Sequence, residues 1–216
     1  MKISQMIDHT LLRPDATMTE IEQLCREAVT LDMASVCVNG TWVATCADLL
    51  RNSGVNVCTV VGFPLGAMAT EAKAHEAQVA AEQGATEIDM VLNIGAVKDA
   101  NWTLVTSDIA AVVAAAPRSL IKVILETALL TDDEIVAACR AAVAGGAHFV
   151  KTSTGFAGAG ASIEAVALMR QTVGNELGVK ASGGIHTPTQ LNELISAGAT
   201  RIGSSAGQAL LERTER

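Results

Sequence analysis

The chain has 216 residues, of which 50% are hydrophobic, and a net charge of −8 from 15 basic and 23 acidic residues. No basic cluster is present, so nucleic acid is not an expected partner, because a phosphate backbone requires a concentrated positive surface. The N-terminus lacks the apolar stretch of a signal peptide and no apolar run reaches membrane-spanning length, so we expect a cytoplasmic protein without a membrane partner.

Strand-like and helix-like segments alternate from one end of the chain to the other. The β-like runs begin about every 20 to 35 residues, which is the length of a strand plus a crossover helix. With only two tryptophans, three phenylalanines and no tyrosine, the interior must be aliphatic, as is typical of parallel strands covered by helices. We expect strands near residues 6–10, 34–38, 56–61, 86–92, 119–126, 147–153, 178–182 and 200–204.

Three of the intervening helices have a recognisable start. In each, a threonine precedes a glutamate or glutamine by three residues, which is the pattern of a capping box. These boxes begin at Thr17, Thr131 and Thr187, and Pro188 then occupies the favourable first helical position. Glycines mark the helix ends. The expected helical segments are 69–83, 132–144 and 188–197, followed by Gly84, Gly145-Gly146 and Gly198 respectively.

The uninterrupted series of eight β-α units predicts an α/β protein, a single (β/α)8 TIM barrel domain over residues 1–216. The alternative is an open doubly wound sheet, but no G-x-G-x-x-G follows the first clear strand. In a barrel, the carboxyl ends of the strands carry the chemistry, and phosphate is usually bound near the last two β-α loops.

Two lysines lie in apolar β-like segments. Lys151 is in H-F-V-K-T-S-T-G and Lys180 is in G-V-K-A-S-G-G, so we expect each at the carboxyl end of a strand. Burial, or a second cation nearby, lowers the pKa of an amine and makes the neutral form available as a nucleophile. The pair therefore predicts covalent chemistry on a carbonyl group. The simpler alternative is that both side chains extend from strand ends into solvent.

The last two predicted strands run into turns rich in glycine and serine, S-G-G at residues 182–184 and G-S-S-A-G at residues 203–207. Glycine allows backbone N–H groups to approach an anion closely, and a helix beginning after Ser205 would add its positive end. We therefore expect a phosphorylated small substrate. Ordinary tight β-α turns, which also favour these residues, are the alternative.

A carboxylate completes the expected site. Asp89 lies among apolar residues in E-I-D-M-V, and a buried carboxylate is costly unless it meets a cation. We expect Asp89, Lys151 and Lys180 to converge inside the barrel, where a purely structural salt bridge is the alternative role for Asp89. Secondary candidates are Asp8 and the pair Lys122 and Glu126, expected on one face of the fifth strand.

Metal chemistry has little support in the sequence. The four histidines show no His-x-His or His-x-x-x-His spacing, and the only conceivable set would combine Asp8, His9 and His186. The cysteines are odd in number and include no C-x-x-C pair, which favours reduced, mostly buried thiols. The cysteines are Cys25, Cys37, Cys46, Cys58 and Cys139.

Seven segments in a fixed order identify a family. They are I-D-H-T-L-L from Ile7, V-C-V from Val36, V-V-G-F-P-L-G from Val60, E-I-D-M-V from Glu87, K-V-I-L-E-T from Lys122, F-V-K-T-S-T-G-F from Phe149 and V-K-A-S-G-G-I from Val179. Between about residues 6 and 208 the chain thereby resembles deoxyribose-phosphate aldolases of the short bacterial type. The resemblance implies a TIM barrel and a metal-independent class I aldolase without a cofactor. It also implies interconversion of 2-deoxy-D-ribose 5-phosphate with acetaldehyde and D-glyceraldehyde 3-phosphate, in the breakdown of deoxyribose phosphate from deoxynucleosides.

The resemblance also implies a role for each candidate residue. The lysine of K-T-S-T-G carries the Schiff base in the family, which gives this role to Lys151. The lysine of V-K-A-S-G-G and the aspartate of E-I-D-M-V transfer protons, which gives these roles to Lys180 and Asp89. The residues expected to contact the substrate or its phosphate are Thr154, Gly155, Gly183, Gly184, Gly203, Ser204 and Ser205.

The chain departs from some family members at two places. Where they carry a lysine after K-T-S-T-G, this chain has Phe156, and its end at 211–216 lacks the tyrosine that reaches their active site. The cation at the phosphate and the role of the tail are therefore left open. Family members are commonly dimers or tetramers, so we expect a homo-oligomer.

Three other functions are compatible with parts of the pattern. A transaldolase-like Schiff-base enzyme would share the lysine but take a ketose donor. A metal-dependent lyase would lose activity to EDTA. A sugar-phosphate-binding protein would bind its ligand without forming an imine.

Overall fold

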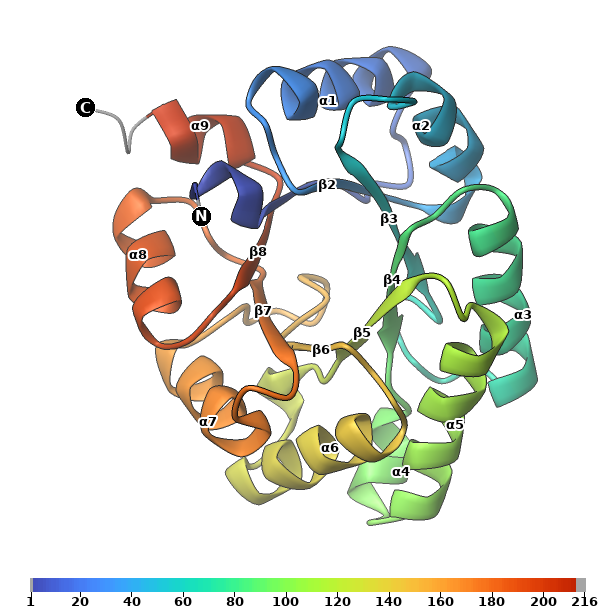
Figure 1. Ribbon diagram of the computed structural model, residues 1–216. Coiled ribbons are helices and arrows are strands. Elements are labelled where there is room, and N and C mark those ends of the chain that lie inside the picture. Colours follow the sequence, from blue (N-terminus) through green and yellow to red (C-terminus); the bar gives the residue numbers. More distant parts are fainter. Residues whose placement is uncertain (1, 213–216) are drawn as a thin grey trace.

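The computed structural model describes residues 2–212 of the chain, and the end of the tail at 213–216 lies outside the described residues. Its strands form a closed barrel in sequence order, with every neighbouring pair parallel and β8 paired to β1 (Figure 1). The predicted (β/α)8 fold is confirmed. The strands are β1 (Ile7–Leu11), β2 (Ser35–Val38), β3 (Asn56–Val61), β4 (Glu87–Val91), β5 (Leu120–Ile124), β6 (Phe149–Lys151), β7 (Gly178–Ser182) and β8 (Arg201–Ser204).

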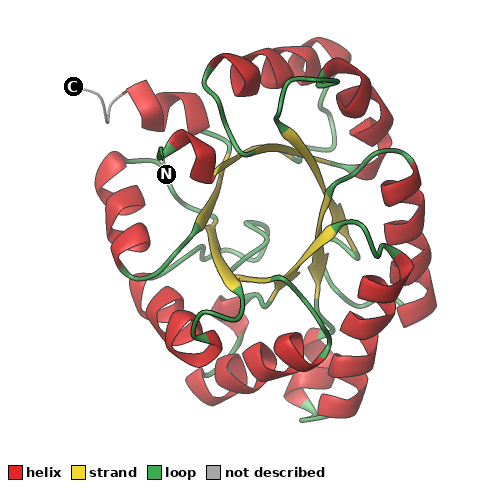
Figure 2. Ribbon diagram, in the orientation of Figure 1, coloured by secondary structure: helices red, strands yellow, loops and turns green. Residues whose placement is uncertain are grey.

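Helices surround the strands on the outside, as the red ring around the yellow barrel in Figure 2 shows. All three predicted capping boxes form, at Thr17, Thr131 and Thr187. None of the helices in the described part of the chain is long and apolar enough to span a bilayer. The helices are α1 (Met18–Thr30), α2 (Val43–Leu49), α3 (Thr70–Glu82), α4 (Ile94–Lys98), α5 (Trp102–Ala115), α6 (Asp132–Ala144), α7 (Ile163–Val173), α8 (Pro188–Ser196) and α9 (Gly207–Glu212), with short 3-10 turns at Ser4–Met6, Gly40–Trp42 and Thr127–Leu129.

Successive strand residues alternate between two environments, as the period of two requires. On β4, Ile88 and Met90 belong to the large aliphatic core, which includes residues of both strands and helices. Glu87 and Asp89, on the same strand, are buried in the barrel interior, where they meet the lysine side chains of other strands. The barrel interior is therefore unusually polar, and this places ionisable groups under the carboxyl ends of the strands.

Two predicted positions are wrong in detail. Lys180 is the third residue of β7, which continues to Ser182, so this lysine does not end its strand. The fifth strand ends at Ile124, and Glu126 follows it in a left-handed conformation with φ +57°. Glu126 therefore does not share a strand face with Lys122. Its carboxylate instead accepts hydrogen bonds from the backbone N–H and the hydroxyl of Thr154.

Candidate active site

Three lysines converge on Asp89, whose side chain is fully buried. Lys151 Nζ and Lys180 Nζ each lie 2.7 Å from Asp89 Oδ2, and Lys122 Nζ lies 2.8 Å from Oδ1. The predicted convergence of Asp89, Lys151 and Lys180 is therefore present. Lys122, expected only as a secondary candidate, completes the set.

Strand register explains this convergence. Lys151 on β6 is the direct partner of Lys180 on β7, and Asp89 on β4 is the direct partner of Lys122 on β5. Residues paired across neighbouring strands point to the same face of the sheet, here the barrel interior. Two such pairs from adjacent parts of the barrel bring one carboxylate within reach of three amines.

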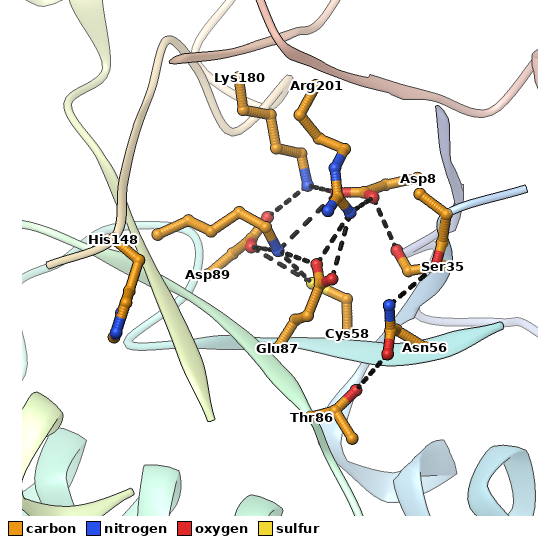
Figure 3. Close-up of polar contacts among 12 residues, drawn as sticks. Asp8, Ser35, Asn56, Cys58, Thr86, Glu87, Asp89, His148, Lys180 and Arg201 are labelled. Atoms are coloured by element: carbon orange, nitrogen blue, oxygen red, sulfur yellow. Dashed lines mark hydrogen bonds and ion pairs between the residues drawn. The ribbon is translucent and has the colours of Figure 1, made fainter. Parts of the chain in front are cut away.

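The ionic network continues beyond these residues to two that the sequence did not single out, Glu87 and Arg201. Glu87 lies 2.7 Å from Lys122 Nζ, and Arg201 Nη1 lies 3.0 Å from Glu87 Oε2 and 2.6 Å from Asp8 Oδ1. Asp8 also pairs with Lys180. Figure 3 shows the side chains of Asp8, Glu87, Lys180 and Arg201 turned toward one another. Glu87 could have been found from its spacing, because a residue two positions before Asp89 shares its face of the strand.

The network contains one more basic group than it has carboxylates. It contains four basic groups, Lys122, Lys151, Lys180 and Arg201, but three carboxylates, Asp8, Glu87 and Asp89. Lys122, Lys180 and Arg201 each pair with at least two of the carboxylates. Among these described groups Lys151 has the weakest anchoring, since it pairs with Asp89 alone, at an oxygen that Lys180 shares.

The environment fixes the charges of the groups around Lys151. Burial by itself raises the pKa of Asp89, but Lys122, Lys151 and Lys180 hold it well below its usual range. Burial lowers the pKa of Lys180, but the carboxylates of Asp8 and Asp89 more than offset this and raise it above that of a free lysine. Lys180 is therefore an ammonium ion and Asp89 a carboxylate at neutral pH.

A cavity of about 680 Å³ opens above this network, at the carboxyl ends of the strands. Lys151 lines it, whereas Lys122, Lys180 and Asp89 lie completely buried beneath. Every residue expected to contact the substrate or its phosphate also lines this cavity. These residues are Thr154, Gly155, Gly183, Gly184, Gly203, Ser204 and Ser205.

The glycine-rich turn after β7 has a geometry that only glycine accommodates. Gly183 has φ +88°, and a Cβ atom there would lie 2.9 Å from Cα of Gly160. Its carbonyl accepts a hydrogen bond from the N–H of Ala161, 3.1 Å away, so the turn is packed tightly against the β6–α7 loop. Gly184 has φ +73°, but a Cβ atom there would meet no other atom within 4 Å. The space beside Gly184 is therefore open, unlike the space beside Gly183.

One serine predicted to contact phosphate is already engaged within the protein. The Ser204 hydroxyl donates to the carbonyl of Ile185 at 3.0 Å and accepts from the N–H of Ala206 at 3.0 Å. It therefore connects the turn after β7 to the turn after β8. Ser205 is exposed toward the cavity and its hydroxyl is not engaged in this way.

A small apolar cluster lies beside Asp89, whose Oδ1 is 3.2 Å from Cys58 Sγ. A small cluster inside the barrel consists of Leu12, Cys37, Cys58 and Val60, with Phe63 packed against it. The ring of Phe63 meets that of Phe156 edge to face, with centroids 5.2 Å apart. The β3–α3 loop that carries Phe63 is held to the end of β4, since a Cβ on Gly66 would lie 2.0 Å from the carbonyl oxygen of Leu92.

The conceivable metal set of Asp8, His9 and His186 does not assemble. His9 Nε2 instead lies 2.7 Å from Glu27 Oε2, and Asp8 pairs with Lys180 and Arg201. Within residues 2–212, two other groups of potential ligand atoms lie close together, Cys37 with Cys58 and Asp89, and Asp8 with Cys58 and Glu87. The ammonium group of Lys122 lies 3.3 Å from Cys58 Sγ and opposes binding of a further cation at both.

Comparison with known proteins gives matches along nearly the whole chain. The profile of the DeoC/LacD family aldolase matches residues 2–213. A deoxyribose-phosphate aldolase of Lactococcus lactis subsp. lactis is 56% identical over 212 residues, which cover 98% of this chain and 96% of the relative. The protein of the same name from Halalkalibacterium halodurans is 58% identical over 217 residues, covering 99% and 97%.

Solved structures agree with these sequence matches. A structure from Coccidioides immitis superposes with a TM-score of 0.96 at 44% identity, covering 99% of this chain and 86% of the other. A deoxyribose phosphate aldolase from Aeropyrum pernix, described as a tetramer, superposes with a TM-score of 0.92 at 32% identity, covering 99% and 91%.

Proposed function

Because the chain belongs to the DeoC/LacD family of aldolases, we propose that Lys151 is the amine that joins covalently to the substrate. The enzyme reversibly cleaves 2-deoxy-D-ribose 5-phosphate to D-glyceraldehyde 3-phosphate and acetaldehyde, the activity after which its relatives are named. One observation carries the choice of Lys151. Of the four basic groups in the buried network, this amine alone lines the cavity, and it has the fewest ionic partners.

The reaction begins with attack of the Lys151 amine on C1 of the open-chain sugar phosphate. Loss of water from the adduct gives an iminium ion, which attracts electrons more strongly than the original aldehyde. The neighbouring ammonium group of Lys180 is placed to donate a proton to the departing oxygen. Asp89 holds both side chains and balances the positive charge that the iminium carries.

Cleavage takes place between C2 and C3, because acetaldehyde keeps C1 and C2. A base removes the proton of the C3 hydroxyl, the C2–C3 electrons move into the iminium, and glyceraldehyde 3-phosphate leaves. Asp89 receives this proton through Lys180 or through a water molecule. The enamine left on Lys151 is then protonated at C2, and hydrolysis of the resulting iminium releases acetaldehyde and restores the amine.

The phosphate occupies the opposite end of the cavity, at the turns after β7 and β8. Support comes from Gly184 and Ser205, which line the cavity that joins these turns to Lys151, since backbone N–H groups of such turns can bind an anion. Thr154 and Gly155 contact the sugar from the turn after β6. Fixing the phosphate places C1 near the amine and thereby supplies orientation.

The test is to trap the intermediate. The enzyme is incubated with acetaldehyde and reduced with borohydride, and the modified peptide is located by mass spectrometry. An adduct on Lys151, lost in Lys151→Ala, supports the proposal, whereas adducts only on exposed lysines such as Lys98 contradict it. Trapping by dihydroxyacetone in place of acetaldehyde would indicate a transaldolase-like enzyme, and loss of turnover in EDTA would indicate a metal-dependent lyase.

The number of subunits and the cellular location of the enzyme are also proposed. A homo-oligomer, either a dimer or a tetramer, is supported by the tetrameric relative from Aeropyrum pernix. A single catalytic barrel over residues 1–216 and a cytoplasmic location stay predictions from the sequence. Light scattering of the purified protein measures the number of subunits.

A further inference from the structure

Glu87 and Arg201 form a buried ion pair beneath the active site. Glu87 comes from β4 and is 3% exposed, and the Arg201 side chain comes from β8 and is 13% exposed. Arg201 Nη1 lies 3.2 and 3.0 Å from the two oxygens of Glu87, and its guanidinium lies over the ring of Phe149. Neither residue lines the cavity or pairs with Lys151.

Each member of this pair holds a residue that acts closer to the substrate. Glu87 lies 2.7 Å from Lys122, which in turn lies 2.8 Å from Asp89. Arg201 lies 2.6 Å from Asp8, which in turn pairs with Lys180. The pair is thus one residue removed from Asp89, which contacts Lys151, and from Lys180, which shares the same oxygen of Asp89.

We propose that Glu87 and Arg201 are positioning residues whose opposite charges set the pH range in which the Lys151 amine reacts. This inference depends on the proposed role of Lys151. The negative charge of Glu87 stabilises an additional positive charge in the network, and the positive charge of Arg201 destabilises it. Because both are fixed in a water-poor interior, each acts on the amine through space as well as through the contacts of Asp89 and Lys180.

Ionisable groups from all the other strands surround Lys151 in the barrel interior and its cavity, and the effect of one substitution is measured against this background. Removing Glu87 leaves four basic groups with two carboxylates, and removing Arg201 leaves three with three. The groups are Asp8 and His9 on β1, Cys37 on β2, Cys58 on β3, Glu87 and Asp89 on β4, Lys122 on β5, Lys180 on β7 and Arg201 on β8, with Glu126 in the turn after β5 and Arg13, Glu20, Glu27 and His186 at the cavity wall.

The two substitutions therefore have opposite effects on pH dependence. In Glu87→Gln positive charge at Lys151 loses a stabilising carboxylate, so the acidic limb of the pH profile should move to lower pH. In Arg201→Gln positive charge at Lys151 loses a repelling neighbour, so the acidic limb should move to higher pH. Each shift in the acidic limb of the pH profile should be about half a pH unit or more. The double variant should return close to the original profile, since it removes both charges.

Further variants distinguish charge from structure. Arg201→Lys keeps the positive charge and should keep the original pH profile even where turnover falls. Asp108→Asn disrupts another buried ion pair, with Lys73 at 2.7 Å between α3 and α5, and serves as the matched control. It should lower stability without moving the acidic limb.

The experiment measures two profiles between about pH 5 and pH 9, which are kcat/KM for the sugar phosphate and the rate at which acetaldehyde and cyanoborohydride label Lys151. Opposite shifts in Glu87→Gln and Arg201→Gln, in both profiles, support the inference. Shifts in the same direction, or none, overturn it while labelling of Lys151 continues. Failure to label Lys151 in the unaltered enzyme would instead overturn the proposed function. If Glu87→Gln does not fold, the comparison of Arg201→Gln with Arg201→Lys decides the matter.

Discussion

Lys151 and Lys180 are direct partners on neighbouring parallel strands, and both donate to the same oxygen of Asp89 at 2.7 Å. One carboxylate oxygen thus accepts hydrogen bonds from two amines that lie in different environments. Lys180 is held as an ammonium ion by a second carboxylate, that of Asp8, whereas Lys151 has no second carboxylate among its described partners and reaches the cavity. The arrangement separates the amine that reacts from the amine that transfers protons.

The first prediction concerns this difference between the two lysines. Lys151→Ala and Lys151→Arg should both abolish turnover and acetaldehyde trapping, because a guanidinium keeps the charge but cannot form an imine. Lys180→Met should lower kcat by about 10²- to 10⁴-fold, the usual contribution of a proton-transfer group, but should leave some trapping on Lys151. Steady-state kinetics and peptide mass spectrometry measure both effects. Full activity in Lys151→Arg would refute the assignment.

The second prediction concerns the stability that Asp89 provides. Asp89→Asn leaves three lysine side chains around an uncharged amide and should lower the free energy of unfolding by about 3–5 kcal/mol, the usual cost of removing one partner from a buried ion pair. Urea denaturation measures the loss. Asp108→Asn should cost a similar amount but retain kcat in the folded fraction, because Asp108 lies outside the barrel interior. Equal loss of kcat in both variants would mean that Asp89 acts only through stability.

The third prediction separates two adjacent glycines. Gly183→Ala must accept both φ +88° and a contact of 2.9 Å with Gly160, so it should displace the turn and raise KM for the phosphorylated sugar by tenfold or more. Gly184→Ala meets only the unfavourable φ, which costs about 1 kcal/mol, and should change KM less. Acetaldehyde trapping, which needs no phosphate, should survive in both. Loss of trapping in Gly184→Ala would contradict this division of roles.

The fourth prediction concerns stability and pH. Burial raises the pKa of Asp8 and of Asp89, but Lys180, Lys122 and Arg201 lower the pKa of Asp8, and Lys122, Lys151 and Lys180 lower that of Asp89. These carboxylates therefore stabilise the fold fully above about pH 4 and lose this contribution as the pH falls through their lowered values. Lys180 has a raised pKa, so its contribution is complete below about pH 10 and is lost only at more alkaline pH. The free energy of unfolding should therefore fall steeply below about pH 4. Asp8→Asn should show a shallower acid dependence, and an unchanged slope would contradict the linkage.

Much of the fold could be predicted because its signals are local. The capping boxes at Thr17, Thr131 and Thr187 each lie within four residues, and all three form. The strands recur at the length of a β-α unit, which sets the number of units without any knowledge of long-range contacts. Strand ends were less accurate, because the end of β5 depends on the left-handed turn at Glu126 and not on hydrophobicity.

The residues that contact the cavity were found more completely than those beneath it. Lys151 and the glycine turns stand at strand ends, where polar residues interrupt an apolar pattern. Glu87 and Arg201 were missed because their importance arises from closure of the barrel, which places β4 and β8 on either side of one interior. The spacing of Glu87 to Asp89 was a local signal that was not used, whereas Arg201 at the start of β8 has no local feature that distinguishes an inward partner from an exposed one.

The close fit of Gly66 against Leu92 limits how the enzyme can be altered to accept bulkier aldehydes. Any side chain at position 66 would push the β3–α3 loop away from the strand that carries Asp89. Leu65 beside it is 73% exposed, and Phe156, whose ring meets that of Phe63 on the same loop, is 56% exposed, so both have room to vary. Libraries aimed at new acceptors should therefore randomise positions 65 and 156 and leave glycine at 66.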